Sequence, residues 1–338
     1  MGGRKHKVLV AMSGGVDSSV SAALLKKEGY EATGVFLRLH PYFKKNEKKA
    51  LRAAEEIGIS LRILDCQKEF EKKIIGRFLA AYKKGQTPNP CVVCNQEIKF
   101  NFLLKEKKKM GADFIATGHH VRVCKGSGGY RLLKAKDESK DQSYFLWRLG
   151  QNVLSSAIFP AGNYKKIKIR ELAKKMNLSA ATEPDSQEIC FAGSTAEEFI
   201  KENLGFKKGK IKDKKGQELG WHKGLWFYTK GQRKRIGLSG GPYYVLGKDF
   251  KKNILVVTKD PKDLFSREVI FKHENWISGK NPDFPVRIKA KIRLGHKPSS
   301  ALLDCSKIVF EKPQAAVVPG QSVVFYSSEE LLGGGIIV

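Results

Sequence analysis

Three cysteines carry the clearest chemical signal in this sequence. Cys91 and Cys94 stand at CxxC spacing in the stretch TPNPCVVCN, and Cys190 lies far downstream in DSQEICFAG. Two thiols at this spacing can reach one metal ion, and a nearby helix start lowers the pKa of a thiol. We expect Asn95 to cap a helix that begins just after the pair. The trio is therefore a candidate for metal or sulfur chemistry.

Several kinds of site are compatible with these three thiols. A structural zinc ion needs four protein ligands, and no second CxxC or nearby Cys/His pair supplies them, whereas a catalytic zinc with three ligands stays open. A dithiol redox pair fits the CxxC spacing but leaves the glycine-rich stretch described next without a purpose. An iron–sulfur cluster with one open iron suits three thiolates on separate loops.

A glycine turn near the start of the sequence is the second signal. Val8–Ala11 form an apolar run typical of a buried parallel strand, Ser13–Gly15 interrupt it, and Asp17 and Ser18 stand where a helix should begin. The backbone N–H groups of such a turn favour an anion, with phosphate as the obvious candidate. The glycines could also serve only a tight turn, but the flanking strand and helix favour a nucleotide. No Lys follows them, so the turn is not a P-loop.

The segments around these residues alternate between strand and helix. This order predicts a doubly wound parallel sheet that binds its ligands at the carboxyl ends of the strands. The expected strands are Glu31–Leu37, Leu61–Leu64 and Phe114–Thr117. The expected helices are Lys44–Ile57, Lys68–Tyr82, Asn95–Met110, Tyr164–Met176 and one that ends near Leu204 after a capping box at Thr195–Glu198. In the first of these helices we expect Ala50, Leu51, Ala54 and Ile57 to point inward. Between Arg122 and Leu133 we expect a hairpin that projects from the sheet.

The character of the sequence changes after Lys207, where glycines and prolines separate short apolar runs. We expect a small β-rich domain and then an all-β unit that forms a six-strand barrel. The predicted domains are therefore residues 1–205, 206–266 and 267–338. The predicted strands of the last two domains are Leu225–Thr229, Tyr243–Leu246, Ile254–Thr258, Val286–Arg293, Lys307–Glu311 and Ser322–Tyr326.

Composition indicates a polyanionic partner. The 338 residues carry a formal charge of +29, far more than solubility needs, so nucleic acid is the default partner. No apolar segment approaches the ~20 residues of a membrane helix, and the apolar run in MGGRKHKVLVAM is expected to be a strand rather than a signal peptide. Six cysteines in a chain of this size predict a cytoplasmic protein with reduced thiols.

Six motifs together carry a resemblance to a known family. The motif SGGVDS resembles the pyrophosphate loop of the ATP pyrophosphatases. The ordered set SGGVDSS, TPNPCVVCN, ATGHHVR, KDQSYFL, SQEICF and GQRKRIG resembles the tRNA-specific 2-thiouridylases, which replace O2 of the wobble uridine with sulfur. This resemblance implies a PP-loop catalytic domain of the adenine nucleotide alpha hydrolase type, a small central domain and a C-terminal β-barrel. It also implies ATP and Mg²⁺ as cofactors.

The resemblance also assigns roles to individual residues. It implies that Cys94 is the nucleophile, that Cys190 carries a persulfide, and that the base contacts Asn89, Pro90 and Cys91. The implied substrate is the anticodon stem-loop of a tRNA, with sulfur from a donor protein or from inorganic sulfide. The implied ATP contacts are Ala11, Met12, Ser13, Gly14, Gly15, Val16, Asp17, Ser18, Leu37 and Gly118, and the implied tRNA contacts are His119, Lys140, Asp141, Gln142, Arg293, Leu294 and Gln321.

One departure from the family pattern bears on mechanism. Many members have Asp where this chain has Cys91, and that Asp is the supposed base acting on the sulfur cysteine. The change produces the three-cysteine set of related iron–sulfur tRNA thiolation enzymes, so we expect a 4Fe-4S cluster on Cys91, Cys94 and Cys190. A persulfide relay through Cys94 and Cys190 is the alternative mechanism. Another ATP-dependent PP-loop ligase and a non-catalytic RNA-binding module are the competing functions.

Overall fold

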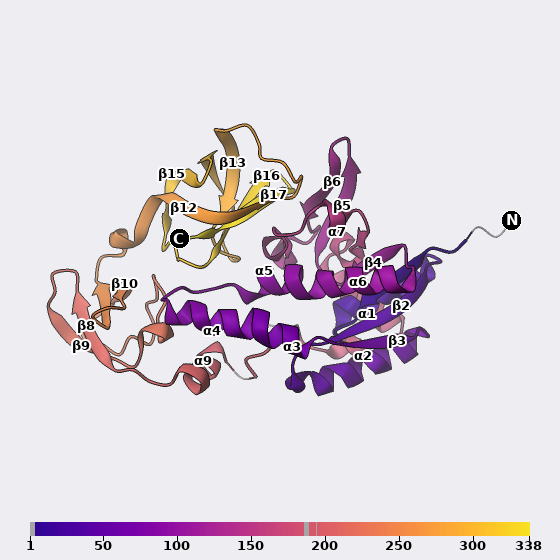
Figure 1. The fold of residues 1–338 in the computed structure, drawn as a ribbon, viewed down its shortest axis with the longest axis horizontal. Coiled ribbons are helices and arrows are strands. Elements are labelled where there is room, and N and C mark those ends of the chain that lie inside the picture. The colour runs from indigo at the N-terminus through magenta and orange to yellow at the C-terminus, as the bar shows by residue number, and fades with distance from the viewer. Residues whose placement is uncertain (1–3, 186–188, 194) are drawn as a thin grey trace.

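The first part of the chain is built on a five-stranded parallel sheet. The computed structural model describes residues 4–185, 189–193 and 195–338. The strands lie in the order β3-β2-β1-β4-β7 and all neighbours are parallel. Their bounds are β1 Lys7–Ala11, β2 Glu31–Arg38, β3 Leu61–Asp65, β4 Phe114–Thr117 and β7 Ala157–Ile158. The predicted doubly wound sheet is confirmed (Figure 1).

Helices cover both faces of this sheet because side chains alternate along each strand. Val8 and Val10 of β1 pack in one core with α1 (Val16–Lys27), α2 (Lys44–Ile57) and α8 (Lys166–Lys175). Leu9 packs in the core of the opposite face, which includes residues of α6 (Asn101–Met110). The prediction that Leu51 of α2 points inward was wrong. Leu51 is 37% exposed, because Ala50, Ala53, Ala54 and Ile57 already form the inward stripe.

Two long helical rods contain π-helical turns. The first runs through α3 (Gln67–Phe70), a π segment at Glu71–Ile75 and α4 (Gly76–Lys83). The second runs through α5 (Pro90–Cys94), a π segment at Asn95–Phe100 and α6. This second helix begins before the predicted Asn95. Asn89 is its cap instead and accepts a hydrogen bond from the Cys91 N–H, while Pro90 fits the first helical position because that residue needs no N–H donor.

A hairpin joins the parallel-sheet domain to the C-terminal barrel. Its strands are β5 (Val121–Gly126) and β6 (Gly129–Lys134), as the alternation predicted. Rather than projecting alone, β6 pairs with β17 of the barrel through Leu132 and Leu133. Between the hairpin and β7 lies α7 (Gln151–Leu154). Trp147, in the segment just before α7, is fully buried, and its Nε1 donates to Ser322 Oγ of the barrel at 3.0 Å.

The central part of the chain carries a four-stranded sheet in the order β10-β11-β8-β9. It follows α9 (Ala196–Leu204), which Thr195 caps by accepting from the Glu198 N–H at 3.2 Å. The strands are β8 Gly209–Asp213, β9 Glu218–His222, β10 Tyr244–Asp249 and β11 Ile254–Thr258. The predicted strand at Leu225–Thr229 was wrong. Leu225–Phe227 form a 3₁₀ turn, whose N-cap Gly224 has a φ of +154°.

The C-terminal part is a closed six-stranded barrel, as predicted. The barrel strands follow the order β12-β15-β14-β13-β16-β17, and an additional β12–β17 pairing closes the ring (Figure 1). Their bounds are β12 Phe265–Trp276, β13 Val286–Lys291, β14 Ser299–Asp304, β15 Lys307–Ala315, β16 Ser322–Ser327 and β17 Glu330–Ile337. The remaining 3₁₀ turns are Pro41–Phe43, Glu138–Lys140, Ser143–Phe145, Pro160–Asn163, Ser179–Thr182 and Pro261–Leu264.

Among the described residues, none of the helices has both the length and the apolar character needed to cross a bilayer.

Candidate active site

The glycine turn after β1 has the geometry of an anion-binding loop. Gly14 has a φ of +80°, and a Cβ added there would lie 2.8 Å from the Asn46 carbonyl oxygen of α2. Gly15 is the N-cap of α1 and supplies no side-chain cap, so the first turn of the helix keeps N–H groups for an outside partner. Ser18 Oγ accepts from the Ser13 N–H at 3.2 Å and thereby holds the turn closed.

The end of β4 packs directly against this turn. Gly118 follows β4, and a Cβ added there would lie 2.6 Å from the backbone nitrogen of Ser18. Met12, just after β1, is fully buried, and its N–H donates to the Val35 carbonyl of β2 at 2.9 Å. The predicted ATP contacts between Ala11 and Ser18, together with Leu37 of β2 and Gly118, therefore lie at or just beyond the carboxyl ends of three adjacent strands. Parallel sheets bind their ligands at this edge.

Asp17 is held by two partners from distant parts of the chain. Lys166 Nζ, from the start of α8, lies 2.6 Å from each carboxylate oxygen, and His120 Nε2 lies 2.9 Å from Oδ1. Burial opposes ionisation of this carboxyl group, but hydrogen bonds from His120 and Lys166 outweigh that cost and lower the pKa of Asp17 below its usual value. Asp17 is therefore ionised at neutral pH.

A second carboxylate completes a charged cluster around Lys166. Asp185 lies 3.0 Å from Lys166 Nζ, 2.8 Å from Lys140 Nζ and 2.7 Å from Arg170 Nη2. Burial again opposes ionisation, and the Lys140 and Lys166 partners hold the pKa of Asp185 well below its usual range. Sequence reasoning missed Lys166 and Arg170, which belong to no recognisable motif in this lysine-rich chain. It also missed Asp185, although this residue begins the DSQEICFAG stretch, because that stretch was considered only for Cys190. The contact between His120 and Asp17 was also missed.

His119 lies beside the same edge of the sheet in its neutral form. Its Nδ1 is 2.7 Å from Thr117 Oγ1, and its ring stacks on Phe100 at 5.9 Å between centroids. Burial, followed by the positive charge of Lys99, lowers the pKa of His119 to about 3. Asp17 acts on His119 in the opposite direction. His119 is therefore within electrostatic reach of the glycine turn on one side and of Lys99 on the other.

The three cysteines lie within electrostatic range of Lys99. Cys94 is only 5% exposed and belongs to a core with Phe78 and Phe191, whereas Cys190 is exposed as a residue although its thiol group is desolvated. Lys99 acts electrostatically on the thiols of Cys91, Cys94 and Cys190, and the thiols of Cys91 and Cys190 both act on Cys94. The three thiols, distant in sequence, therefore gather in one region. Within the described part of the chain, no hydrogen bond or ion pair occupies the Lys99 ammonium group.

The expected effect of a helix start on the thiols was wrong. Burial raises the pKa of Cys91, that of Cys94 to about 12 and that of Cys190 to about 11, and Lys99 only partly offsets it. At Cys91, in the first turn of the helix, burial outweighs the effect of the helix start, and Cys94 lies beyond that turn. The helix continues past it into the π segment and α6, so desolvation outweighs any dipole effect.

A metal centre at this site would require ligands that lie close to one another. Ligands of one zinc ion bond at about 2.3 Å and so must lie within about 4 Å of one another. No three His, Cys, Asp or Glu side chains among residues 4–185, 189–193 and 195–338 are placed to hold one metal ion. The catalytic-zinc alternative is therefore not supported. Cysteine thiolates are the ligands that iron–sulfur clusters use, and the ligands of such a cluster stand further apart than those of a single ion. Residues 186–188 of the SQEICF motif lie outside the described residues.

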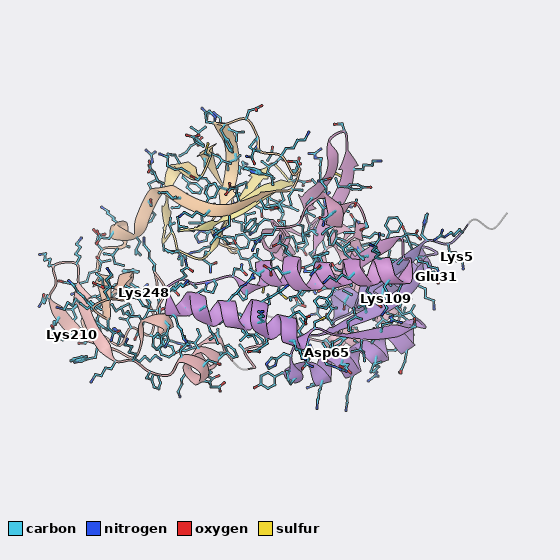
Figure 2. All side chains as sticks on the ribbon, in the orientation of Figure 1. Lys5, Glu31, Asp65, Lys109, Lys210 and Lys248 are labelled. Atoms are coloured by element: carbon cyan, nitrogen blue, oxygen red, sulfur yellow. The ribbon has the colours of Figure 1, made fainter. Side chains whose placement is uncertain are left out.

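The loop before the CxxC pair is held by both of the other domains. Gln321 Nε2 of the barrel donates to the Thr87 carbonyl at 2.6 Å, and the Thr87 N–H donates to the Pro319 carbonyl at 2.9 Å. From the central sheet, Lys248 Nζ donates to the Gly85 carbonyl at 3.3 Å, and Figure 2 shows Lys248 beside the end of α4. The loop that positions Asn89, Pro90 and Cys91 is therefore a junction of three domains.

The other predicted tRNA contacts lie in two places. Lys140, Asp141 and Gln142 form a turn beside the glycine loop, where Gln142 Oε1 accepts from the His120 N–H at 2.9 Å and Asp141 Oδ2 accepts from Ser143 Oγ at 2.6 Å. Arg293 and Leu294 follow β13 of the barrel. Arg293 Nη2 donates to the Ala316 carbonyl at 2.8 Å, and Leu294 is exposed.

Family models match almost the whole described chain. Residues 6–194 match a model described as tRNA methyl transferase HUP domain. Residues 197–259 match tRNA methyl transferase PRC-barrel domain, and residues 266–337 match Aminomethyltransferase beta-barrel domain.

Full-length relatives share one printed name. The chain is 43% identical over 339 residues to "tRNA-specific 2-thiouridylase MnmA" of Syntrophomonas wolfei, covering 98% of this chain and 99% of the relative. A relative of the same name from Halothermothrix orenii is 43% identical, with 98% of each chain covered. A solved structure of U34-tRNA thiolase NcsA from Methanococcus maripaludis, with its [4Fe-4S] cluster, is 19% identical in sequence. The match covers 60% of this chain and 67% of that chain, and its TM-score of 0.38 is too low to support an argument.

Proposed function

Because the chain belongs to the family of tRNA-specific 2-thiouridylases, we propose that its glycine turn and its three cysteines act together on one wobble uridine. The protein is an ATP-dependent tRNA-uridine 2-sulfurtransferase. The observation that supports our assignment of residues is the electrostatic link across the site. Lys99 acts on all three thiols and on His119, and Asp17 of the glycine turn acts on His119 as well.

In the first step the uridine is activated, because its O2 is a poor leaving group. O2 attacks the α-phosphorus of ATP. The bond between that phosphorus and the oxygen bridging to the β-phosphate breaks, and its electron pair leaves with pyrophosphate. The N–H groups of the glycine turn bind phosphate oxygens, and Asp17, which is ionised, is a suitable ligand for Mg²⁺. The target base must leave its stack to reach the edge of the sheet. Asn89 and Pro90 then contact it from the loop that the other two domains hold.

In the second step sulfur replaces the adenylylated oxygen. A relay uses Cys190 to carry the terminal sulfur, which attacks C2 while AMP leaves. Cys94 then attacks the Cys190 sulfur, releases the thiolated base and forms a disulfide that an external thiol reduces. Its exposed position suits Cys190 to accept the outer sulfur of a persulfide on a donor protein, which leaves as a thiol, whereas burial protects Cys94. In this relay, and in the cluster version described next, Lys99 stabilises the anionic sulfur.

We favour the version in which Cys91, Cys94 and Cys190 hold a 4Fe-4S cluster. Such a cluster would bind sulfide at the iron that no cysteine ligates. Cys91 supports this choice because it supplies a third thiol where many family members have an Asp that acts as a base. In addition, Asn89 fixes the start of the helix that carries Cys91. The tRNA substrate favours a cytoplasmic location.

The cluster is tested by iron content and activity together. We expect anaerobically reconstituted protein to be brown, to bind about four irons per chain, and to thiolate tRNA with ATP and sulfide only when iron-loaded. Cys91→Ser should lose both iron and activity, whereas Cys305→Ser, at an exposed cysteine of the barrel, should lose neither. Iron-free protein that still forms 2-thiouridine would reject the cluster and favour the relay.

The role of Lys99 predicts a pH dependence. Since burial raises the pKa of Cys190 to about 11 and Lys99 lowers it, the thiolate is a minor species at pH 7 and increases about tenfold per pH unit up to that pKa. Lys99→Gln should raise this pKa further and slow alkylation of Cys190 by iodoacetamide in the metal-free protein between pH 7 and 10. Lys105→Gln, on the next part of the same helix, is the control. Equal alkylation rates in the two variants would remove Lys99 from the sulfur site.

A further inference from the structure

The glycine turn lacks a cation of its own for the phosphates of ATP. Its sequence from Ser13 to Ser19 contains Asp17 and no Lys or Arg. Pyrophosphate gains negative charge as it leaves, so a cation aimed at that charge would lower the barrier. In P-loop proteins a lysine at the end of the loop has this role. Here the corresponding charge must come from another element of the fold.

Lys166 is the buried cation nearest to the turn. It is the first residue of α8 and is only 8% exposed, although lysine is almost never fully buried unless paired. Its Nζ lies 2.6 Å from both oxygens of Asp17 and 3.0 Å from Asp185. The Lys166 N–H also donates to Asp137 at 2.9 Å, which fixes the backbone at this point. The ammonium group is therefore delivered to the glycine turn by a rigid helix start.

The cluster around Lys166 has as many carboxylates as permanent cations. Its carboxylates are Asp17, Asp185 and Asp137, and its permanent cations are Lys166, Lys140 and Arg170. Beside it, His120 is only 3% exposed, and its Nδ1 has no hydrogen-bond partner within the described chain, although Nε2 is bound to Asp17. An orphaned buried nitrogen is expected where a ligand or water completes the site.

We propose that Lys166 binds the β- and γ-phosphates of ATP and stabilises the departing pyrophosphate, with Asp185 holding its ammonium group in place. Without nucleotide, Asp17 and Asp185 share the ammonium charge. When Mg²⁺ takes the Asp17 carboxylate, Lys166 exchanges that partner for a phosphate oxygen. In the reaction, uridine O2 bonds to the α-phosphorus, the electron pair of the broken bond passes to pyrophosphate, and the uridine N3 proton goes to solvent. The proposal rests on the nucleotide role of the glycine turn, not on the cysteine chemistry.

The test separates phosphate binding from general support of the fold. Binding of α,β-methylene-ATP with Mg²⁺ and of AMP is measured by calorimetry, without any turnover. Lys166→Gln should weaken binding of the ATP analogue about tenfold or more. Binding of AMP should weaken less than about twofold, because AMP lacks the two terminal phosphates. Lys166→Arg should recover most of the loss. Lys168→Gln, exposed on the same helix and paired with Glu171 at 3.0 Å, is the matched control.

Two results would overturn the proposal. One is an equal loss of affinity for both ligands in Lys166→Gln, and the other is no loss for either. If this variant does not fold because two carboxylates lose their partner, the comparison is made between Asp17→Asn and the double variant Asp17→Asn/Lys166→Gln. The double variant should again bind the ATP analogue more weakly than the single one, and equal binding contradicts the role of Lys166. Loss of thiolation in a cysteine variant that still binds nucleotide leaves this inference intact.

Discussion

Cys94→Ser should reduce 2-thiouridine formation by roughly a thousandfold or more, since the hydroxyl group can neither accept sulfur nor ligate iron. The change is nearly isosteric, and Cys94 makes no hydrogen bond that the fold needs within the described chain, so folding should be retained. The measurement is the 2-thiouridine content of a substrate tRNA after incubation with ATP and a sulfur source. Binding of α,β-methylene-ATP should be unchanged, because Cys94 lies on α5 and not on the glycine turn.

The controls for Cys94 separate the competing functions. Cys305→Ser should retain full activity because that exposed thiol belongs to the barrel. A PP-loop ligase of another kind would remain active without Cys94, and an RNA-binding module would act independently of ATP. Full activity of Cys94→Ser would therefore contradict the thiolation mechanism while leaving the nucleotide site in place.

Gly118→Ala should reduce ATP affinity by about tenfold or more and destabilise the fold by about 1–3 kcal/mol, as overpacking of a tight contact does. The added Cβ would lie 2.6 Å from the Ser18 nitrogen and 2.8 Å from the Asp17 carbonyl carbon. These are backbone atoms of the first turn of α1, so they cannot rotate away, and the N–H groups of the turn must shift. The measurements are calorimetric binding of α,β-methylene-ATP and thermal unfolding.

A matched variant checks that this effect is local. Gly128 lies in the turn of the β5–β6 hairpin, and a Cβ added there meets nothing within 4 Å. Gly128→Ala should therefore leave both nucleotide binding and thermal unfolding unchanged. If Gly118→Ala bound the ATP analogue as well as the parent protein does, the end of β4 would not define the nucleotide site.

The strand–turn–helix unit at Lys7–Lys27 was predictable because its signals are local. Apolar residues at a buried strand, glycines that permit a positive φ and polar residues at a helix start act within a few residues of one another. The same holds for α2 and for the cap of α9. The predicted cap at Asn95 failed for a related reason. Asn89 and Asn95 are both acceptable caps by composition, and only the packing of the helix past Cys94 selects the first.

The sequence by itself determined the parallel sheet, the glycine turn, the β-rich C-terminal part and the candidate thiols, because periodicity and residue type encode them directly. The tertiary structure alone decided which charges meet. Asp17 is joined to Lys166, and Asp185 to Lys140, by contacts between residues far apart in the chain. It also decided that burial raises the pKa of the thiols. Such effects depend on distance and desolvation, which arise only when separate elements pack, so no local pattern records them.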